Sequence, residues 1–247
     1  KADVIYEDSQ SFFGNVAFYA QSEPSGSDDR FSFTMNQTRL GFSTQGPQVY
    51  GGKPKGVVEV DFYGGGSSEP SPNLRLYRAY LEFVWPSFSL LIGQDWDTFS
   101  KLYGKNLNFA YPPVGNLQFR RPQIRGTQKF TLNDHSRIIL AAAIAQPTSP
   151  DLDGSGINDG SDSGLPVFQG RLAYEYDLIS KLPPLTLAVS GHWGQEEVDF
   201  IGPNAEVDID TWSINAEYVF PLCPYAYLKG EFFYGSNLDA YFGGILQ

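Results

Sequence analysis

Apolar and polar residues alternate one by one along most of the chain, which is the pattern of β-strands with two different faces. Between residues 210 and 220, for example, Trp212, Ile214 and Ala216 alternate with Ser213 and Asn215. We expect about eleven strands of this kind. They cover residues 12–21, 30–43, 58–62, 74–85, 88–95, 123–132, 137–146, 167–177, 185–193, 210–220 and 225–234.

The connections between these strands fall into two classes of length. One class is polar and mostly long, and comprises residues 24–29, 64–73, 98–118, 147–166 and 195–207. The other class is mostly short, and comprises residues 86–87, 133–135, 178–184 and 221–224, with 44–54 as the exception. Long loops at one end and short turns at the other are typical of outer-membrane barrels. We therefore predict an all-β fold, an antiparallel transmembrane β-barrel.

The composition agrees with strands rather than helices. The chain has 247 residues, with 26 Gly, 17 Pro and 15% aromatic residues, and aromatic residues favour strands. The longest apolar run, residues 138–145, is far shorter than the roughly 20 residues of a membrane-spanning helix. Aromatic residues also stand at strand ends, as an interfacial girdle requires: Tyr63, Trp85, Trp96, Tyr103, Trp193, Phe220 and Tyr225.

Charged residues occupy the polar face of many predicted strands. Examples are Lys129, Arg171, Glu175, Glu217 and Glu231. A water-filled lumen accommodates such charges, whereas a packed core accepts them only at a cost of several kcal/mol each, by rough estimate. A soluble β-sandwich that places this whole face in solvent is the alternative. It would be a carbohydrate-binding module with Trp193 and Trp212 as stacking platforms, and its apolar faces would meet each other.

Five stretches of the sequence resemble one known family. They are QTRLGF (37–42), VVEVDF (57–62), LRLYRAYL (74–81), LIGQDWDTF (91–99) and RPQIR (121–125), and in order and spacing they are similar to the DcaP-like outer-membrane porins of Gram-negative bacteria. The likeness covers residues 11–145 best. It implies a homotrimeric barrel of about sixteen strands in the outer-membrane lipid, a diffusion channel for small anionic solutes such as dicarboxylates.

The number of predicted strands bears on the domain organisation. Single-chain bacterial barrels have an even number of strands, and about eleven is odd and below the number that the resemblance implies. We therefore expect residues 1–247 to be a single barrel domain that is incomplete at the C-terminus.

Arginines provide the candidate selectivity site. The chain has a net charge of -11, but its acidic residues gather in the expected long loops. Six arginines lie on or beside strands: Arg39, Arg75, Arg78, Arg120, Arg121 and Arg125. Since guanidinium groups match carboxylates in geometry and charge, we predict that these six form one wall of a pore constriction, opposite Glu59, Asp61 and Glu82. We also predict that the segment 98–118 folds inward. The alternative is that several arginines only pair with these acids.

One acidic loop has the spacing of a calcium site. Oxygen-bearing residues stand at loop positions one, three, five, nine and twelve, and a glycine stands at position six, as in calcium-binding loops. The residues are Asp151, Asp153, Ser155, Asp159 and Asp162. An ordinary solvated loop explains the same residues, and both interpretations stay open.

The sequence offers little for other chemistry. The single cysteine, Cys223, excludes an internal disulfide and a multi-thiolate zinc site. Neither His135 nor His192 accompanies a nucleophile motif such as Gly-x-Ser-x-Gly. We therefore expect neither an enzyme nor a bound cofactor, and no nucleic-acid partner.

Overall fold

The computed structural model describes most of the chain. It covers residues 3–7, 9–12, 16–20, 30–34, 36, 38–64, 73–102, 116–149, 151, 156–179, 182–199 and 206–241.

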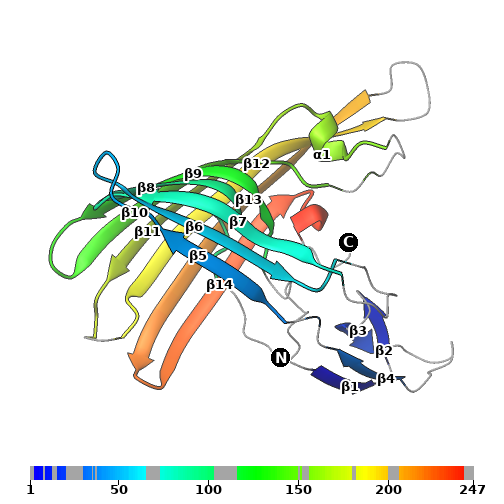
Figure 1. Ribbon diagram of the computed structural model, residues 1–247, viewed down its shortest axis with the longest axis horizontal. Coiled ribbons are helices and arrows are strands. Elements are labelled where there is room, and N and C mark those ends of the chain that lie inside the picture. The colour runs from blue at the N-terminus through cyan, green and yellow to red at the C-terminus, as the bar shows by residue number, and fades with distance from the viewer. Residues whose placement is uncertain are drawn as a thin grey trace.

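Ten antiparallel strands form one large curved sheet in which the spatial order is the chain order, from β5 to β14 (Figure 1). Each strand reverses into its hydrogen-bonded neighbour, so the sheet is a meander. Over the described residues it is open between its two edge strands, β5 and β14. The strands are β5 (Leu40–Gln45), β6 (Lys53–Asp61), β7 (Arg75–Val84), β8 (Phe88–Trp96), β9 (Arg120–Thr131), β10 (Ser136–Ala145), β11 (Val167–Tyr176), β12 (Leu185–Asp199), β13 (Glu206–Cys223) and β14 (Ala226–Ser236).

The N-terminal strands differ from the prediction. β1 (Asp3–Glu7) pairs with β4 (Arg30–Thr34), and β2 (Ser9–Phe12) pairs with β3 (Val16–Ala20), in two small separate sheets. The predicted strand 12–21 is therefore divided between β2 and β3, and the predicted strand 30–43 between β4 and β5. Alternation continues on both sides of such a break, so the pattern alone does not locate it.

From β6 onward the predicted strands are confirmed, with two corrections to their ends. β6 begins at Lys53, five residues before the predicted strand 58–62. β12 and β13 continue pairing as far as Asp199 and Glu206, so most of the predicted loop 195–207 is strand. Acidic residues are frequent there, among them Glu196, Glu197 and Asp199, which made the segment look like a loop. Two short helical elements, α1 (Asp159–Asp162) and η1 (Asp239–Tyr241), complete the described chain. No helix of the described residues is long and apolar enough to cross a membrane.

The two faces of the large sheet are opposite in character. The outer face exposes large apolar side chains, among them Ile92, Ile124, Leu140, Leu172, Val189, Ile214 and Phe232. The inner face buries polar and charged side chains, among them Asp61, Asp95, Arg121, Gln123, Gln169, His192 and Glu217. A soluble protein arranges these classes the other way round, whereas a lipid-facing wall requires this arrangement. The predicted barrel-type fold is confirmed. The sandwich is not supported, because neither of the two small sheets of the described residues makes extensive contact with the ten-stranded sheet.

Candidate functional site

Two bidentate ion pairs join β6 to β7 on the inner face. Arg75 donates from Nε and Nη2 to the Asp61 carboxylate at 2.9 and 2.6 Å, and Arg78 donates to both Glu59 oxygens at 2.9 Å. In the strand register, Asp61 faces Arg75 and Glu59 faces Arg78. A β-bulge between these pairs leaves Tyr77 as the extra residue of β7. The pairs therefore follow directly from the strand register.

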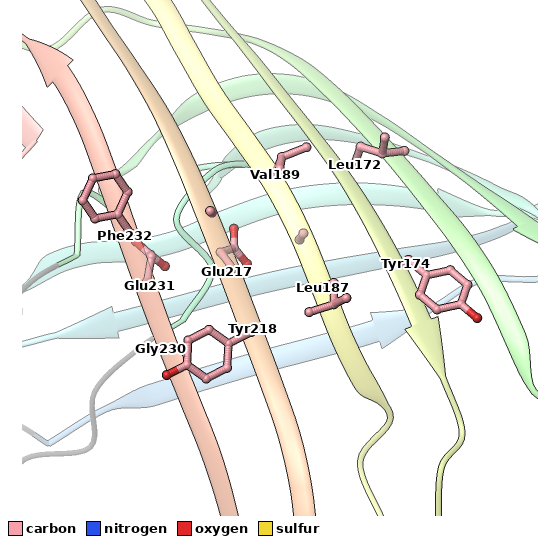
Figure 2. A pocket seen from close by; sticks show the side chains of 11 residues that line it. Leu172, Tyr174, Leu187, Val189, Glu217, Tyr218, Gly230, Glu231 and Phe232 are labelled. Atoms are coloured by element: carbon pink, nitrogen blue, oxygen red, sulfur yellow. The ribbon is translucent and has the colours of Figure 1, made fainter.

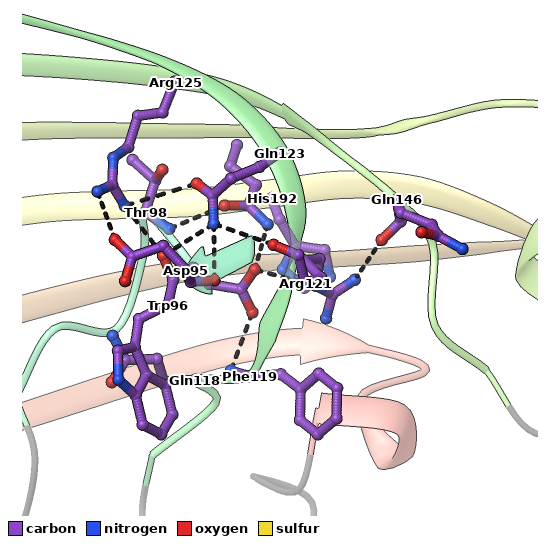
Figure 3. A network of polar contacts seen from close by, with 12 residues as sticks. Asp95, Trp96, Thr98, Gln118, Phe119, Arg121, Gln123, Arg125, Gln146 and His192 are labelled. Atoms are coloured by element: carbon purple, nitrogen blue, oxygen red, sulfur yellow. Dashed lines mark hydrogen bonds and ion pairs between the residues drawn. The ribbon is translucent and has the colours of Figure 1, made fainter. Parts of the chain in front are cut away.

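A second group of charges joins β8 to β9 (Figure 3). Arg125 donates to Asp95 at 2.7 Å, and Arg78 approaches the other Asp95 oxygen at 3.5 Å. Deeper in the wall, Arg121 and Asp97 form an ion pair at 3.0 Å in which both side chains are fully buried. Gln169 and the backbone N–H of Phe119 also donate to Asp97. On the inner wall, Arg78 and Arg125 thus share Asp95, and the Arg75–Asp61 and Arg121–Asp97 pairs lie on the same strands or directly beyond them.

The predicted constriction of six arginines opposite three acids stays a prediction. Within the described residues, Glu59 and Asp61 pair with arginines on the neighbouring strand, as the alternative interpretation expects for several of the six. Glu82 faces Lys55 in the register of β6 and β7. Periodicity could place these residues on one face, but it could not give the strand register that decides which charges face each other.

Arg39 and Arg120 differ from the other four arginines. Their guanidinium carbons lie 3.5 and 4.0 Å from the centroid of the Tyr77 ring, and Arg120 also lies 4.7 Å from the Trp96 ring. Neither arginine forms an ion pair with any part of the chain that the structure describes, whereas Arg75, Arg78, Arg121 and Arg125 all do. Both guanidinium groups are thus held against the ring of one tyrosine instead of a carboxylate.

The segment 97–102, which follows β8, crosses the inner face toward β14. Its backbone N–H groups donate to side chains of three other strands: Thr98 to Gln169 of β11 at 2.8 Å, Ser100 to Ser190 of β12 at 3.3 Å, and Lys101 to Glu217 of β13 at 3.4 Å. The predicted inward fold is therefore present where the structure describes this connection, at residues 98–102 and 116–118. The predicted residues between them lie outside the described part.

A small aromatic cluster holds the same segment. The Phe99 and His192 rings are stacked, with their centroids 4.6 Å apart. The ring of Tyr241, a residue that follows β14, lies 4.2 Å from the His192 ring, again between centroids. Phe99, Leu117 and Tyr241 are almost completely buried and form the main apolar cluster of the described chain. Sequence reasoning missed His192 and Tyr241 as partners of this segment. The alternation around His192 gave its inward direction, but nothing local indicated Tyr241.

Lys101 adds a positive charge to the inward segment. Burial, followed by repulsion from Arg125, lowers its pKa to about 8, although Asp95 and Asp97 act in the other direction. The side chain is half-buried. Lys101 is therefore the one cation of this segment that changes its charge near neutral pH. The sequence prediction did not include it, since the residue stands alone in a loop.

The calcium hypothesis receives no support from the described residues. Asp153 and Ser155 lie outside them. Asp159 and Asp162 stand in the single turn α1, and the Asp151 carboxylate accepts the backbone N–H of Gly156 at 3.0 Å. In the part of the chain that the structure describes, no three His, Cys, Asp or Glu side chains are grouped as metal ligands. The complete five-residue site stays a prediction.

A pocket spans β11 to β14 (Figure 2). Besides Glu217 and Glu231, its lining consists mainly of large side chains that are exposed on the outer face: Leu172, Tyr174, Leu187, Val189, Tyr218 and Phe232. Because most of this lining is apolar and belongs to the outer face, the pocket is not the place where the arginines of the inner face would meet a polar solute.

Comparison with known proteins identifies the fold. No protein family and no curated protein matches this chain by sequence. Among solved structures, the chain is similar to the crystal structure of the outer membrane channel DcaP of Acinetobacter baumannii, with a TM-score of 0.69 and 19% sequence identity. The match covers 97% of this chain and 66% of the DcaP chain. The chain therefore has the fold of this outer-membrane channel over about two thirds of that protein's length.

Proposed function

We propose that this chain forms the wall of an outer-membrane porin, a water-filled channel for passive diffusion of small hydrophilic solutes. The observation that carries the proposal is the distribution of residues on one curved sheet, with exposed apolar side chains on the outer face and charges on the inner face. The apolar outer face is suited to contact with lipid, and the charged inner face is suited to contact with water. The likeness to DcaP supports the same conclusion. The proposed role is transport without catalysis.

We further propose that the solutes are small anions of the dicarboxylate class. Four of the six arginines are already paired with carboxylates, so their charge is largely compensated. Arg39 and Arg120 stack on Tyr77 instead, at the strand ends that carry the long connections. Two guanidinium groups against one tyrosine ring, neither in an ion pair within the described residues, raise the local concentration of anions and offer planar donors to carboxylates.

A porin of this kind places its outer face against lipid and against other subunits. We propose a homotrimer in the bacterial outer membrane, in which exposed aromatic side chains of the outer face lie partly at the subunit interface. We also propose that residues 1–247 belong to one barrel domain that further strands complete, since β5 and β14 are edges over the described residues.

Single-channel recording of the full-length protein in planar bilayers tests the proposal. We expect discrete conductance steps, a reversal potential that favours anions in asymmetric salt, and block by an added dicarboxylate. Arg39→Ala and Arg120→Ala should each reduce the anion preference. Lys129→Ala is the matched control, since it removes a positive charge from the far end of β9, and it should change the preference less.

Two other results would contradict parts of the proposal. A chain that stays in solution without detergent and never conducts would favour the soluble carbohydrate-binding alternative. Conductance with unchanged anion preference in both arginine variants would keep the channel and reject the proposed anion site.

A further inference from the structure

Ser100 lies at the centre of the inward segment in an unusual backbone conformation. Its φ angle is 52°, in the left-handed region that non-glycine residues seldom adopt. The residue is completely buried. A conformation of this kind persists where the surrounding structure holds it, and it is often found where the position of a segment matters. The contacts of Ser100 show what holds it.

Every polar group of Ser100 has a partner. Its backbone N–H donates to Ser190 Oγ at 3.3 Å, and its carbonyl accepts from Asn116 Nδ2 at 3.2 Å. Its hydroxyl accepts the backbone N–H of Leu117 at 3.0 Å and donates to the Glu231 carboxylate in a short hydrogen bond. Ser100 thereby joins the inward segment 97–102 to residues 116 and 117, at the other end of the same connection, and to the wall.

Two glutamates of the wall complete the attachment. Glu217 and Glu231 are direct partners in the register of β13 and β14, and Figure 2 shows them on these neighbouring strands. Glu217 accepts the backbone N–H of Lys101 at 3.4 Å, and Glu231 accepts that of Leu102 at 3.3 Å. Arg171 holds the Glu217 carboxylate at 2.9 Å, and Ser190 donates to it at 3.0 Å.

We propose that Glu217 and Glu231 are positioning residues that hold the backbone of residues 101 and 102, Glu231 also through the Ser100 hydroxyl, and that they thereby fix residues 97–102 on the inner wall and set the size limit of the channel. Hydrogen bonds to carboxylates are stronger than neutral ones, and the backbone N–H groups of an irregular segment must find such acceptors or water. The inference rests on the proposed channel function. It adds that the size limit depends on two strands more than 100 residues away in sequence.

Variants of Glu231 and Ser100 in the full-length protein test this proposal. Glu231→Ala removes the acceptor for two hydrogen bonds, and Ser100→Ala removes the donor hydroxyl. Both should allow larger neutral polyethylene glycols to enter the open channel, where probes without charge exclude any effect on ion selectivity. Glu231→Gln keeps an acceptor oxygen and should stay close to the wild-type limit. Ser100→Gly should also raise the limit, because glycine relieves the backbone conformation but lacks the hydroxyl.

Glu175→Ala is the matched control. Glu175 is an inner-face glutamate of β11 that pairs with Arg137 at the short-turn end of the sheet, away from the inward segment. Its loss should leave the size limit unchanged.

Hydrogen exchange gives a second measurement that does not depend on conductance. In Glu231→Ala, the amides of residues 100–102 should exchange about tenfold faster or more, the factor expected when a hydrogen bond to a charged acceptor is lost. Amides of β13 and β14 near the turn should keep their protection, which shows that the barrel remains folded.

Each outcome decides one question. If the channel conducts and both the size limit and the exchange of residues 100–102 stay at wild-type values in Glu231→Ala and Ser100→Ala, the positioning role is wrong. If the wild-type protein never conducts, the channel function fails, while the exchange measurement still shows whether the glutamates hold the segment.

Discussion

Arg121 and Asp97 are fully buried on the inner face, and at this site a single residue decides much of the local stability. Their ion pair at 3.0 Å lies where no water reaches either side chain. Removing one partner of a buried pair leaves an uncompensated charge, which costs about 3–5 kcal/mol. We therefore expect Arg121→Ala to lower the free energy of unfolding in detergent or lipid by about 3 kcal/mol. Arg39→Ala, which breaks no ion pair, should cost much less, and equal losses in the two variants would contradict this interpretation.

Lys101 makes a second prediction at the residue scale, because its pKa is lowered to about 8. The side chain is a cation below this pH and neutral above it. Raising the pH from about 7 to about 9 should therefore reduce the anion preference of the channel. Reversal potentials in asymmetric salt measure this change. In Lys101→Gln the decrease over this range should be absent, and a variant that keeps the full pH dependence would show that another group titrates.

At the scale of the elements, β7 and β8 meet at a point that admits only glycine. Gly93 has a φ of 130°, and a Cβ atom there would lie 2.3 Å from the Ala79 carbonyl oxygen. Gly93→Ala must therefore distort the pairing of these strands, and we expect it to lower the unfolding free energy by about 1–3 kcal/mol. Gly170→Ala on β11 is the control, since no atom lies within 4 Å of its new methyl group. Denaturant titration of the refolded protein compares the two, and equal stability would overturn this assignment.

At the scale of the whole molecule, the two faces of the sheet should respond to charge in opposite ways. Ile124 on β9 is 54% exposed on the outer face, and Thr127 on the same strand has the parity of the inner-face residues Arg121 and Arg125. An arginine facing the bilayer midplane costs about 2–4 kcal/mol. Ile124→Arg should therefore weaken folding into lipid vesicles far more than Thr127→Arg. Similar effects in both variants would argue against a lipid-facing outer surface.

The sequence alone predicted the strands more completely than it predicted the site. Alternation located β6 to β14, because in a strand the two faces follow every second residue. It failed at β2 and β3, where a reversal leaves the alternation intact. It also failed at the ends of β12 and β13, where acidic residues on a strand look like a loop. For the site, it placed arginines and acids on one face, but it did not give the register that pairs Glu59 and Asp61 with arginines.

The sequence by itself determined the all-β class, the antiparallel order and the polarity of the two faces, since these depend on local spacing and on short connections. Only the tertiary structure decided which charges neutralise each other, because ion pairs such as Arg78 with Glu59 depend on strand register. It also decided that Ser100 meets Glu231, residues that a curved sheet brings together across its interior. Contacts of that range depend on the shape of the whole sheet, and no local pattern in the chain encodes them.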